Sequence, residues 1–184
     1  LVKLVKQQKP DCIVLVDNCY GEFVEQQEPC QVGADLVAGS LIKNPGGGLA
    51  PNGGYIAGQA KLIETIAYHI TAPGLGKELG SSLVDKRWFF QGLFVAPHTV
   101  LQALKGAALL AALFEHAGFR VEPKWNEFRA DIIQSICFNT IDELQRFCQV
   151  VQNCSPVDSD VQLEFARLPG YDVPVIMAAG TFVQ

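Results

Sequence analysis

The chain has 184 residues, of which 49% are hydrophobic, so it can bury the core of one domain, or of one domain and part of another. Its formal net charge is -5 and its 14 lysines and arginines are scattered, which argues against nucleic acid as a partner because phosphate binding needs clustered basic residues. No signal peptide, transmembrane run or low-complexity segment is visible, so we expect no membrane association.

The six cysteines form no C-x-x-C pair and have no zinc-like spacing with the three histidines. This pattern predicts reduced thiols in a cytoplasmic protein and no metal site. The sequence starts at Leu1 and ends directly after a strand-like segment, residues 173–180, so we expect it to be a piece of a longer protein.

Three short strands are expected in the N-terminal part. Residues 12–16 are apolar, rich in β-branched side chains and followed by Asp17, which is typical of a buried parallel strand. Residues 34–40 and 54–58 give two further strands, the last with glycine at both ends. Ligands of open α/β sheets bind at the carboxyl ends of strands, so Asp17 and Lys43 occupy positions where chemistry is expected.

Two helices are expected next. Apolar residues at helical spacing predict an amphipathic helix over residues 60–70. Pro97 is expected to open a longer helix that ends before Gly118. Because most faces of this second helix are apolar, we expect it to be buried between layers or between subunits.

The pattern changes from about residue 119. Short strand-like segments are followed by a helix whose start is marked by the capping box of Thr140 and Glu143. We therefore expect two domains: residues 1–118 as part of a large domain that includes the bridging helix, and residues 119–184 as part of a smaller α+β domain.

Two side chains near the strand ends are candidates for chemistry. A carboxylate such as Asp17 is costly to bury unless a cation pairs with it. Lys43 follows the apolar pair Leu41 and Ile42, so desolvation is expected to lower its pKa and to free the amine as a nucleophile or base. The Ser40 hydroxyl could hold a phosphate, and the glycines after Lys43 would let the backbone pass close to a bound group.

Three segments carry a resemblance to a known family: VDNCYGEF at residues 16–23, GSLIKN at residues 39–44 and GGYIAG at residues 53–58. They resemble the fold-type-I enzymes that use pyridoxal 5'-phosphate (PLP), the aspartate aminotransferase superfamily. Within it the chain is most similar to the methionine gamma-lyase family, whose members are also labelled cystathionine beta-lyase-like or aluminium-resistance proteins. Further matches extend the resemblance over nearly the whole chain, at residues 91–94, 96–98, 155–158, 169–171 and 175–180.

The resemblance implies a cofactor role for each of five residues. Asp17 pairs with the pyridine nitrogen, Asn18 lies beside the ring, and Tyr20 lies near the phenolic oxygen. Ser40 contacts the phosphate, and Lys43 forms the Schiff base and is the catalytic residue. The family's phosphate loop, stacking aromatic and substrate-carboxylate arginine are expected outside these 184 residues.

The implied function is a PLP-dependent carbon-sulfur lyase that acts on a small-molecule substrate, a sulfur-containing amino acid. The resemblance also implies a homo-oligomer, either a dimer or a tetramer. An aminotransferase stays open because the same Asp17 and Lys43 serve both reactions, and so does an incomplete fragment with only an assembly role. Cys19, close to Asp17, could lie near the cofactor, but we interpret it as a buried packing residue.

Overall fold

The computed structural model describes residues 1–78, 80 and 84–178. The chain forms two compact units, one of Leu1–Ala107 with Glu127–Ile133 and the other of Ala108–Asn126 with Gln134–Gln184. Each unit has its own β-sheet. The domain boundaries expected from the sequence, residues 1–118 and 119–184, stay a prediction about the whole protein.

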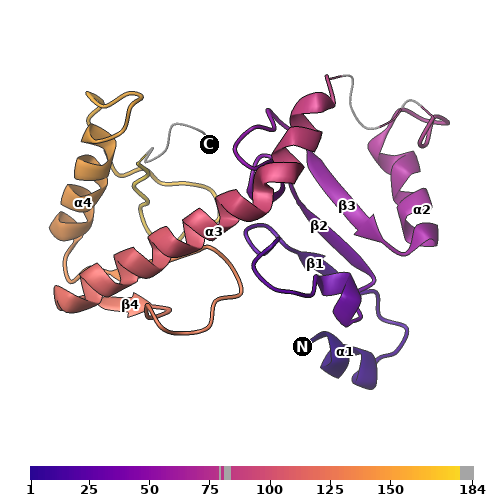
Figure 1. Ribbon diagram of the computed structural model, residues 1–184, viewed down its shortest axis with the longest axis horizontal. Helices are drawn as coiled ribbons and strands as arrows, with labels where there is room; N and C mark the ends of the chain where they lie inside the picture. The colour runs from indigo at the N-terminus through magenta and orange to yellow at the C-terminus, as the bar shows by residue number, and fades with distance from the viewer. Residues whose placement is uncertain (79, 81–83, 179–184) are drawn as a thin grey trace. The chain divides into compact units, whose positions relative to one another are not determined.

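The first unit contains a three-stranded mixed sheet with helices, which confirms the predicted α/β class (Figure 1). Strand β1 (Leu15–Asp17) pairs in parallel with β2 (Leu36–Ser40), and β2 pairs antiparallel with β3 (Gly54–Gly58). β1 starts later than predicted and lies at an edge of the sheet, where it has one neighbouring strand. Leu15 is 58% exposed, so the prediction of a buried strand is wrong for this chain.

The two faces of this sheet carry different residues. Side chains alternate between faces along a strand, and the register places Asp17 opposite Ala38, two residues before Ser40. Asp17, Ala38 and Ser40 therefore share one face, which we call the Asp17 face. Val37 and Tyr55 belong to the opposite face, which we call the Tyr55 face.

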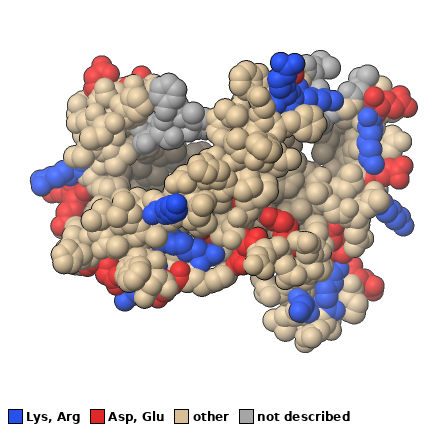
Figure 2. Space-filling model, in the orientation of Figure 1, with Lys and Arg blue, Asp and Glu red and all other residues tan. Residues whose placement is uncertain are grey.

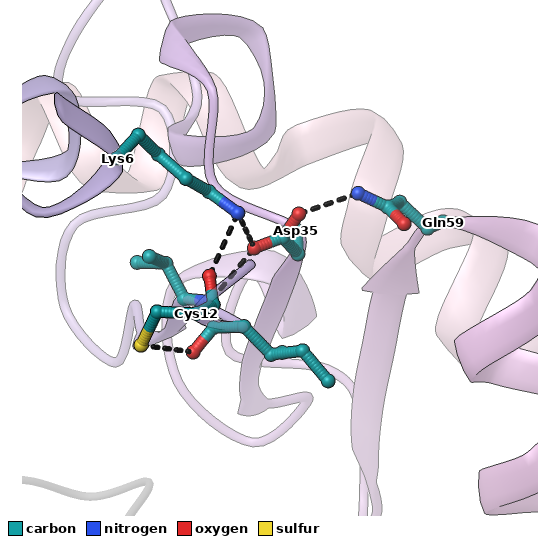
Figure 3. Close-up of polar contacts among 6 residues, drawn as sticks. Lys6, Cys12, Asp35 and Gln59 are labelled. Carbon is teal, nitrogen blue, oxygen red and sulfur yellow. Dashed lines mark hydrogen bonds and ion pairs between the residues drawn. The ribbon is translucent and has the colours of Figure 1, made fainter. Parts of the chain in front are cut away.

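Asp35, which is buried just before β2, ties helix α1 (Val2–Gln8) to the sheet (Figure 3). Its Oδ2 accepts hydrogen bonds from Lys6 Nζ at 2.6 Å and from the Val14 N–H at 2.7 Å. Its Oδ1 accepts a hydrogen bond from Gln59 Nε2 at the end of β3. One carboxylate therefore connects α1, the approach to β1 and the end of β3.

Helix α2 (Ala60–Ile70) has the predicted bounds, whereas α3 (Arg87–His116) begins earlier than predicted. The N–H of the first α3 residue donates to Asp85 Oδ1 at 2.9 Å, so Asp85 supplies the start signal. Pro97 lies inside the helix, and the prediction that it opens the helix is wrong. Gly118, with φ at +90°, follows the helix end as predicted.

Helix α3 passes directly over the loop that follows β2. This loop contains the short 3-10 helix η2 (Asn44–Gly46). A Cβ on Gly92 would clash with the Gly46 carbonyl, and a Cβ on Gly47 would clash with the Gly92 carbonyl. The glycines after Lys43 were expected to admit a bound group, and in the structure they admit the backbone of α3.

Much of the α3 surface is apolar and exposed. Phe90 is 69% exposed and Phe94 is 87% exposed, so this part of the helix is not buried between layers of the described chain, and its burial between subunits stays a prediction. Among the described residues, α3 is the one helix long and apolar enough to cross a membrane, a property that it shares with the core helices of many soluble proteins. On the face drawn in Figure 2, lysine and arginine atoms lie in small separate groups between wide uncharged areas.

The second unit contains strands β4 (Arg120–Glu122) and β5 (Ser135–Cys137), which pair antiparallel, and helix α4 (Ile141–Asn153). Its apolar centre is a cluster of four phenylalanine rings in which neighbouring centroids lie 5.0 to 6.1 Å apart: Phe114, Phe119, Phe138 and Phe147. Edge-to-face contacts of this kind add to the stability gained by burial.

The cap of α4 agrees with its sequence signal. Thr140 Oγ1 accepts a hydrogen bond from the Glu143 N–H at 3.2 Å, as predicted. The Glu143 carboxylate accepts from the Asn139 N–H at 2.8 Å, one residue before the position that a capping box requires. In the strand-like segment 173–180, Val175 forms an isolated bridge with Ala166, and residues 179 and 180 lie outside the described part.

Candidate functional site

Asp17 is the last residue of β1, and its carboxylate is exposed at the carboxyl end of the strand. Its Oδ1 accepts a hydrogen bond from the backbone N–H of Cys19 at 3.1 Å. This bond, together with the positive charge of Lys43, holds the pKa of Asp17 below its ordinary value. The carboxylate is therefore ionised at neutral pH and can pair with a cation.

Lys43 follows β2 by three residues, and its amine lies over an aromatic ring. Lys43 Nζ is 4.2 Å from the centroid of the Tyr20 ring. A cation at this distance from the ring face is attracted by the ring quadrupole. The contact orients the Lys43 amine toward the loop that follows β1.

Desolvation acts to lower the pKa of Lys43, as predicted, but it does not decide the outcome. Interactions with the Tyr20 and Cys19 side chains outweigh it, so the pKa of Lys43 is raised above its ordinary value. The prediction of a lowered pKa is wrong for this chain. The flanking Ile42 is 39% exposed, so the apolar neighbours seen in the sequence do not enclose the amine.

Tyr20 reaches this position through an uncommon backbone conformation. Its φ angle is +74°, in the left-handed region that non-glycine residues rarely adopt. The Tyr20 carbonyl accepts a hydrogen bond from the Ile132 N–H at 3.3 Å. Strained conformations of this kind persist where the surrounding structure fixes them, and they often occur at functional sites.

A pocket of about 390 Å³ lies at the ends of β1 and β2 on the Asp17 face, and we call it the Asp17 pocket. Asp17, Cys19 and Ser40 line it together with glycines of β2 and of the β3 approach. Ser40 Oγ accepts a hydrogen bond from the Ile42 N–H at 3.3 Å, which shapes the turn that leads to Lys43. The structure thus brings Asp17 and Ser40 together and places Lys43 over Tyr20 beside them.

Asn18 does not join this group. Its Nδ2 donates to Glu28 Oε2 at 2.8 Å, and Glu28 lines a different pocket, on the Tyr55 face. The side-chain amide is therefore bonded to a residue of that second pocket, and the role that the resemblance implies for Asn18 stays a prediction.

The sequence matches the family description "Methionine gamma-lyase" over residues 1–184, the whole of the chain. The chain belongs to the methionine gamma-lyase family. Two curated relatives of this methionine gamma-lyase family chain are uncharacterised proteins. The protein YnbB of Bacillus subtilis is 53% identical, with 100% of this chain and 44% of that protein covered. A 33.9 kDa protein of Lactobacillus delbrueckii subsp. bulgaricus is 50% identical, with 100% and 60% covered.

Two solved structures are similar to this family member. One is from Listeria monocytogenes, provisionally named a cystathionine beta-lyase involved in aluminium resistance, with 51% identity and a TM-score of 0.91. The other is a carbon-sulfur lyase involved in aluminium resistance from Clostridium novyi NT, with 54% identity and a TM-score of 0.89. Each match covers 100% of this chain, and 45% and 43% of the respective structures. The family chain thus spans about half of the length of its relatives.

The sequence reasoning missed two features of this methionine gamma-lyase family chain. Cys19 was interpreted as a packing residue, yet it lines the Asp17 pocket and its N–H positions the Asp17 carboxylate. Glu22 is buried at 4% exposure and accepts a hydrogen bond from the Tyr55 hydroxyl at 2.8 Å. An isolated glutamate between a glycine and a phenylalanine carries no sequence signal of burial. Among the described residues, no group of three or more His, Cys, Asp or Glu side chains is arranged to hold a metal ion.

Proposed function

We propose that the whole protein is a PLP-dependent carbon-sulfur lyase that acts on a sulfur-containing amino acid. The observation that carries the proposal is that Asp17 and Ser40 line one pocket at the carboxyl ends of two adjacent parallel strands, with Lys43 close enough for its charge to lower the pKa of Asp17. Membership of the family and the printed name of the Clostridium novyi NT structure support the lyase reaction. The fold-type-I architecture is proposed for the whole protein, since this chain contains three strands of one mixed sheet.

The residues present fit PLP in their chemistry. An ionised carboxylate suits the protonated pyridine nitrogen, a primary amine suits the aldehyde, and a hydroxyl suits the phosphate. When bound, PLP supplies a conjugated ring that accepts the electron pair left on the substrate's α-carbon. Asp17 would hold the ring nitrogen in its protonated state, and Ser40 would contribute one hydrogen bond to the phosphate.

Lys43 would bind the cofactor and then move a proton at the substrate's α-carbon as a general base. Since the pKa of Lys43 is raised in this chain, the amine must lose its proton before it can act. Tyr20 would hold and orient the amine during this step. Loss of a thiolate from the β- or γ-carbon of the substrate completes the reaction that we propose.

We also propose that the whole protein works as a cytoplasmic homo-oligomer. All six cysteines are free and so suit a reducing compartment. The exposed apolar surface of α3 needs a cover that the described residues do not supply.

The experiment uses the full-length protein that contains these 184 residues. The purified protein is incubated with sulfur-containing amino acids, and the release of thiol, ammonia and keto acid is measured. A lyase releases all three, whereas an aminotransferase forms a keto acid without free thiol or ammonia. We expect Lys43→Ala to abolish turnover, and Asp17→Asn to lower kcat by about two orders of magnitude while PLP still binds. Wild-type turnover in Lys43→Ala would refute the proposal.

A further inference from the structure

A second pocket lies away from the Asp17 pocket, on the opposite face of the same sheet. It has a volume of about 930 Å³, and Val37 and Tyr55 of the Tyr55 face line it together with Glu22, Glu28 and Asp35. We call it the Glu22 pocket. None of the side chains that line it is a lysine, an arginine or a histidine.

Of the three carboxylates in this pocket, one has a cationic partner among the described residues. Asp35 pairs with Lys6 at 2.6 Å. Glu28 accepts hydrogen bonds from neutral donors, the Asn18 side-chain amide and the Phe23 N–H. Glu22 Oε1 accepts from the Tyr55 hydroxyl, while Glu22 Oε2 is buried and has no hydrogen-bond partner in the described part of the chain.

Burial of Glu22 has a cost that the hydrogen bonds of this chain offset only in part. Glu22 is 4% exposed, and desolvation raises its pKa above the ordinary value, with a further contribution from the charge of Glu28. The pKa of Tyr55 is also raised, by its own desolvation and by the adjacent Glu22. A buried carboxylate that lacks a positive partner is destabilising, because hydrogen bonds from neutral donors replace only part of the solvation that it had in water.

Glu22 cannot easily turn out of the pocket. Its backbone carbonyl accepts a hydrogen bond at 3.0 Å from Nδ2 of Asn44, which is itself buried. The Glu22 carboxylate and the Tyr55 ring both lie against Gly39, where a Cβ would clash with them. Three strand and loop segments thus hold the carboxylate on the Tyr55 face.

We propose that the Glu22 pocket receives a lysine or arginine side chain from the part of the same protein that lies outside these 184 residues. The chemistry comes from the pocket: a cation with N–H donors would pair with Glu22 Oε2 and with the charge of Glu28, and its aliphatic stem would suit the apolar lining. The comparisons indicate where this side chain comes from: the matched chain covers only 43% to 60% of its relatives, so residues outside it are available to fill the pocket. This part of the protein therefore covers the Tyr55 face.

The test compares two glutamate variants in the full-length protein. Glu22→Gln keeps an oxygen to accept from Tyr55 but removes the charge, and Glu25→Gln is the matched control because Glu25 lies three residues away and is exposed. We expect Glu22→Gln to lower the melting temperature by about 4 °C or more and Glu25→Gln to leave it unchanged.

A crystal structure of the full-length wild-type protein gives a readout that does not depend on a variant's folding. We expect a lysine or arginine nitrogen within about 4 Å of Glu22 Oε2, from a residue outside this chain. A neutral partner or a water at that oxygen would overturn the proposal. So would a melting temperature of Glu22→Gln equal to that of the wild type. A rise in the melting temperature of the full-length protein with agmatine that requires Glu22 would also overturn it, because the pocket would then be open. None of these measurements depends on the reaction catalysed.

Discussion

The amine of Lys43 rests against the face of the Tyr20 ring, and this contact sets the pH at which the amine can react. The ring and the Cys19 thiol favour the protonated form more strongly than desolvation opposes it. The neutral amine therefore appears at a higher pH than for an ordinary lysine.

Replacing the ring should shift this pH dependence. In Tyr20→Leu, the pKa of Lys43 is expected to fall, so that Lys43 reacts with an aldehyde at lower pH than in the wild type. The measurement is the pH profile of reductive alkylation, followed by peptide mapping of Lys43. Tyr68→Leu on α2 serves as the control because Tyr68 is 55% exposed. An unchanged profile in Tyr20→Leu would show that the ring does not hold the amine.

The sequence predicts part of this site because part of it is local. Asp17 and Ser40 end two parallel strands, so their proximity follows from the strand pattern. The pKa of Lys43 could not be predicted in this way, because it depends on a Tyr20 ring that a φ of +74° brings into contact. The direction of Asn18 depends on Glu28, a partner ten residues away in a loop.

At the scale of elements, the hydrophobic pattern predicts where helices and strands occur, whereas hydrogen bonds in loops and caps determine where some of them begin. The helix over residues 60–70 and the strand over residues 54–58 are predicted correctly because their patterns are local and uninterrupted. Pro97 suggested a helix start, but the hydrogen bond to Asp85 sets the start of α3 ten residues earlier. The exposed apolar side of α3 was unpredictable because burial depends on tertiary partners.

The Asp35 network should make the anchoring of α1 depend on pH. The Lys6 hydrogen bond is the main cause that holds the pKa of Asp35 below its ordinary value of 3.8. Its stabilisation is therefore present above that value and is lost as the pH falls through the lower folded pKa. We expect Asp35→Asn to lower the melting temperature at pH 7 and to lower it less at a pH below 3.8, with Asp11→Asn as the exposed control. An equal effect at both pH values would contradict the ionic origin.

The crossing of α3 over the η2 loop should tolerate no added atoms. Gly92→Ala would place a methyl group against the Gly46 carbonyl and is expected to destabilise the first unit by about 1–3 kcal/mol. Gly106→Ala, in the same helix with open space around it, is expected to stabilise by roughly 0.5–1 kcal/mol. Urea denaturation of both variants measures the difference. Similar effects of the two substitutions would show that helix propensity, not the crossing, determines the result.

At the scale of the whole molecule, the exposed apolar surface of α3 and the Asp17 pocket are both incomplete without residues outside this chain. Trp88 is 50% exposed and Leu93 is 49% exposed on the N-terminal half of α3, and the matched relatives are longer than this chain. The Asp17 pocket contributes a carboxylate and one hydroxyl toward a cofactor, which is fewer groups than a tightly bound phosphate ester needs.

The 184-residue chain is therefore expected to bind PLP weakly, although Asp17, Ser40 and Lys43 are present. Most of the binding free energy should come from groups outside this chain, while a lone amine forms only a reversible adduct. Titration of the chain and of its Lys43→Ala variant with PLP, followed by absorbance, measures the difference. Saturable binding at low micromolar PLP that requires Lys43 would show that the site is already complete.

The contact between α3 and the η2 loop also limits which sequences this unit can accept. Gly92 meets Gly46 and Gly47 backbone to backbone, so a side chain on Gly92 or on Gly47 enters the space that the opposing backbone fills. A second substitution cannot compensate for the first, because glycine has no side-chain atoms left to remove. We therefore expect the glycines at this crossing to stay unchanged while other residues of the first unit vary. The backbone of the loop that carries Lys43 then keeps the same geometry even where residues on the surface of α3 differ.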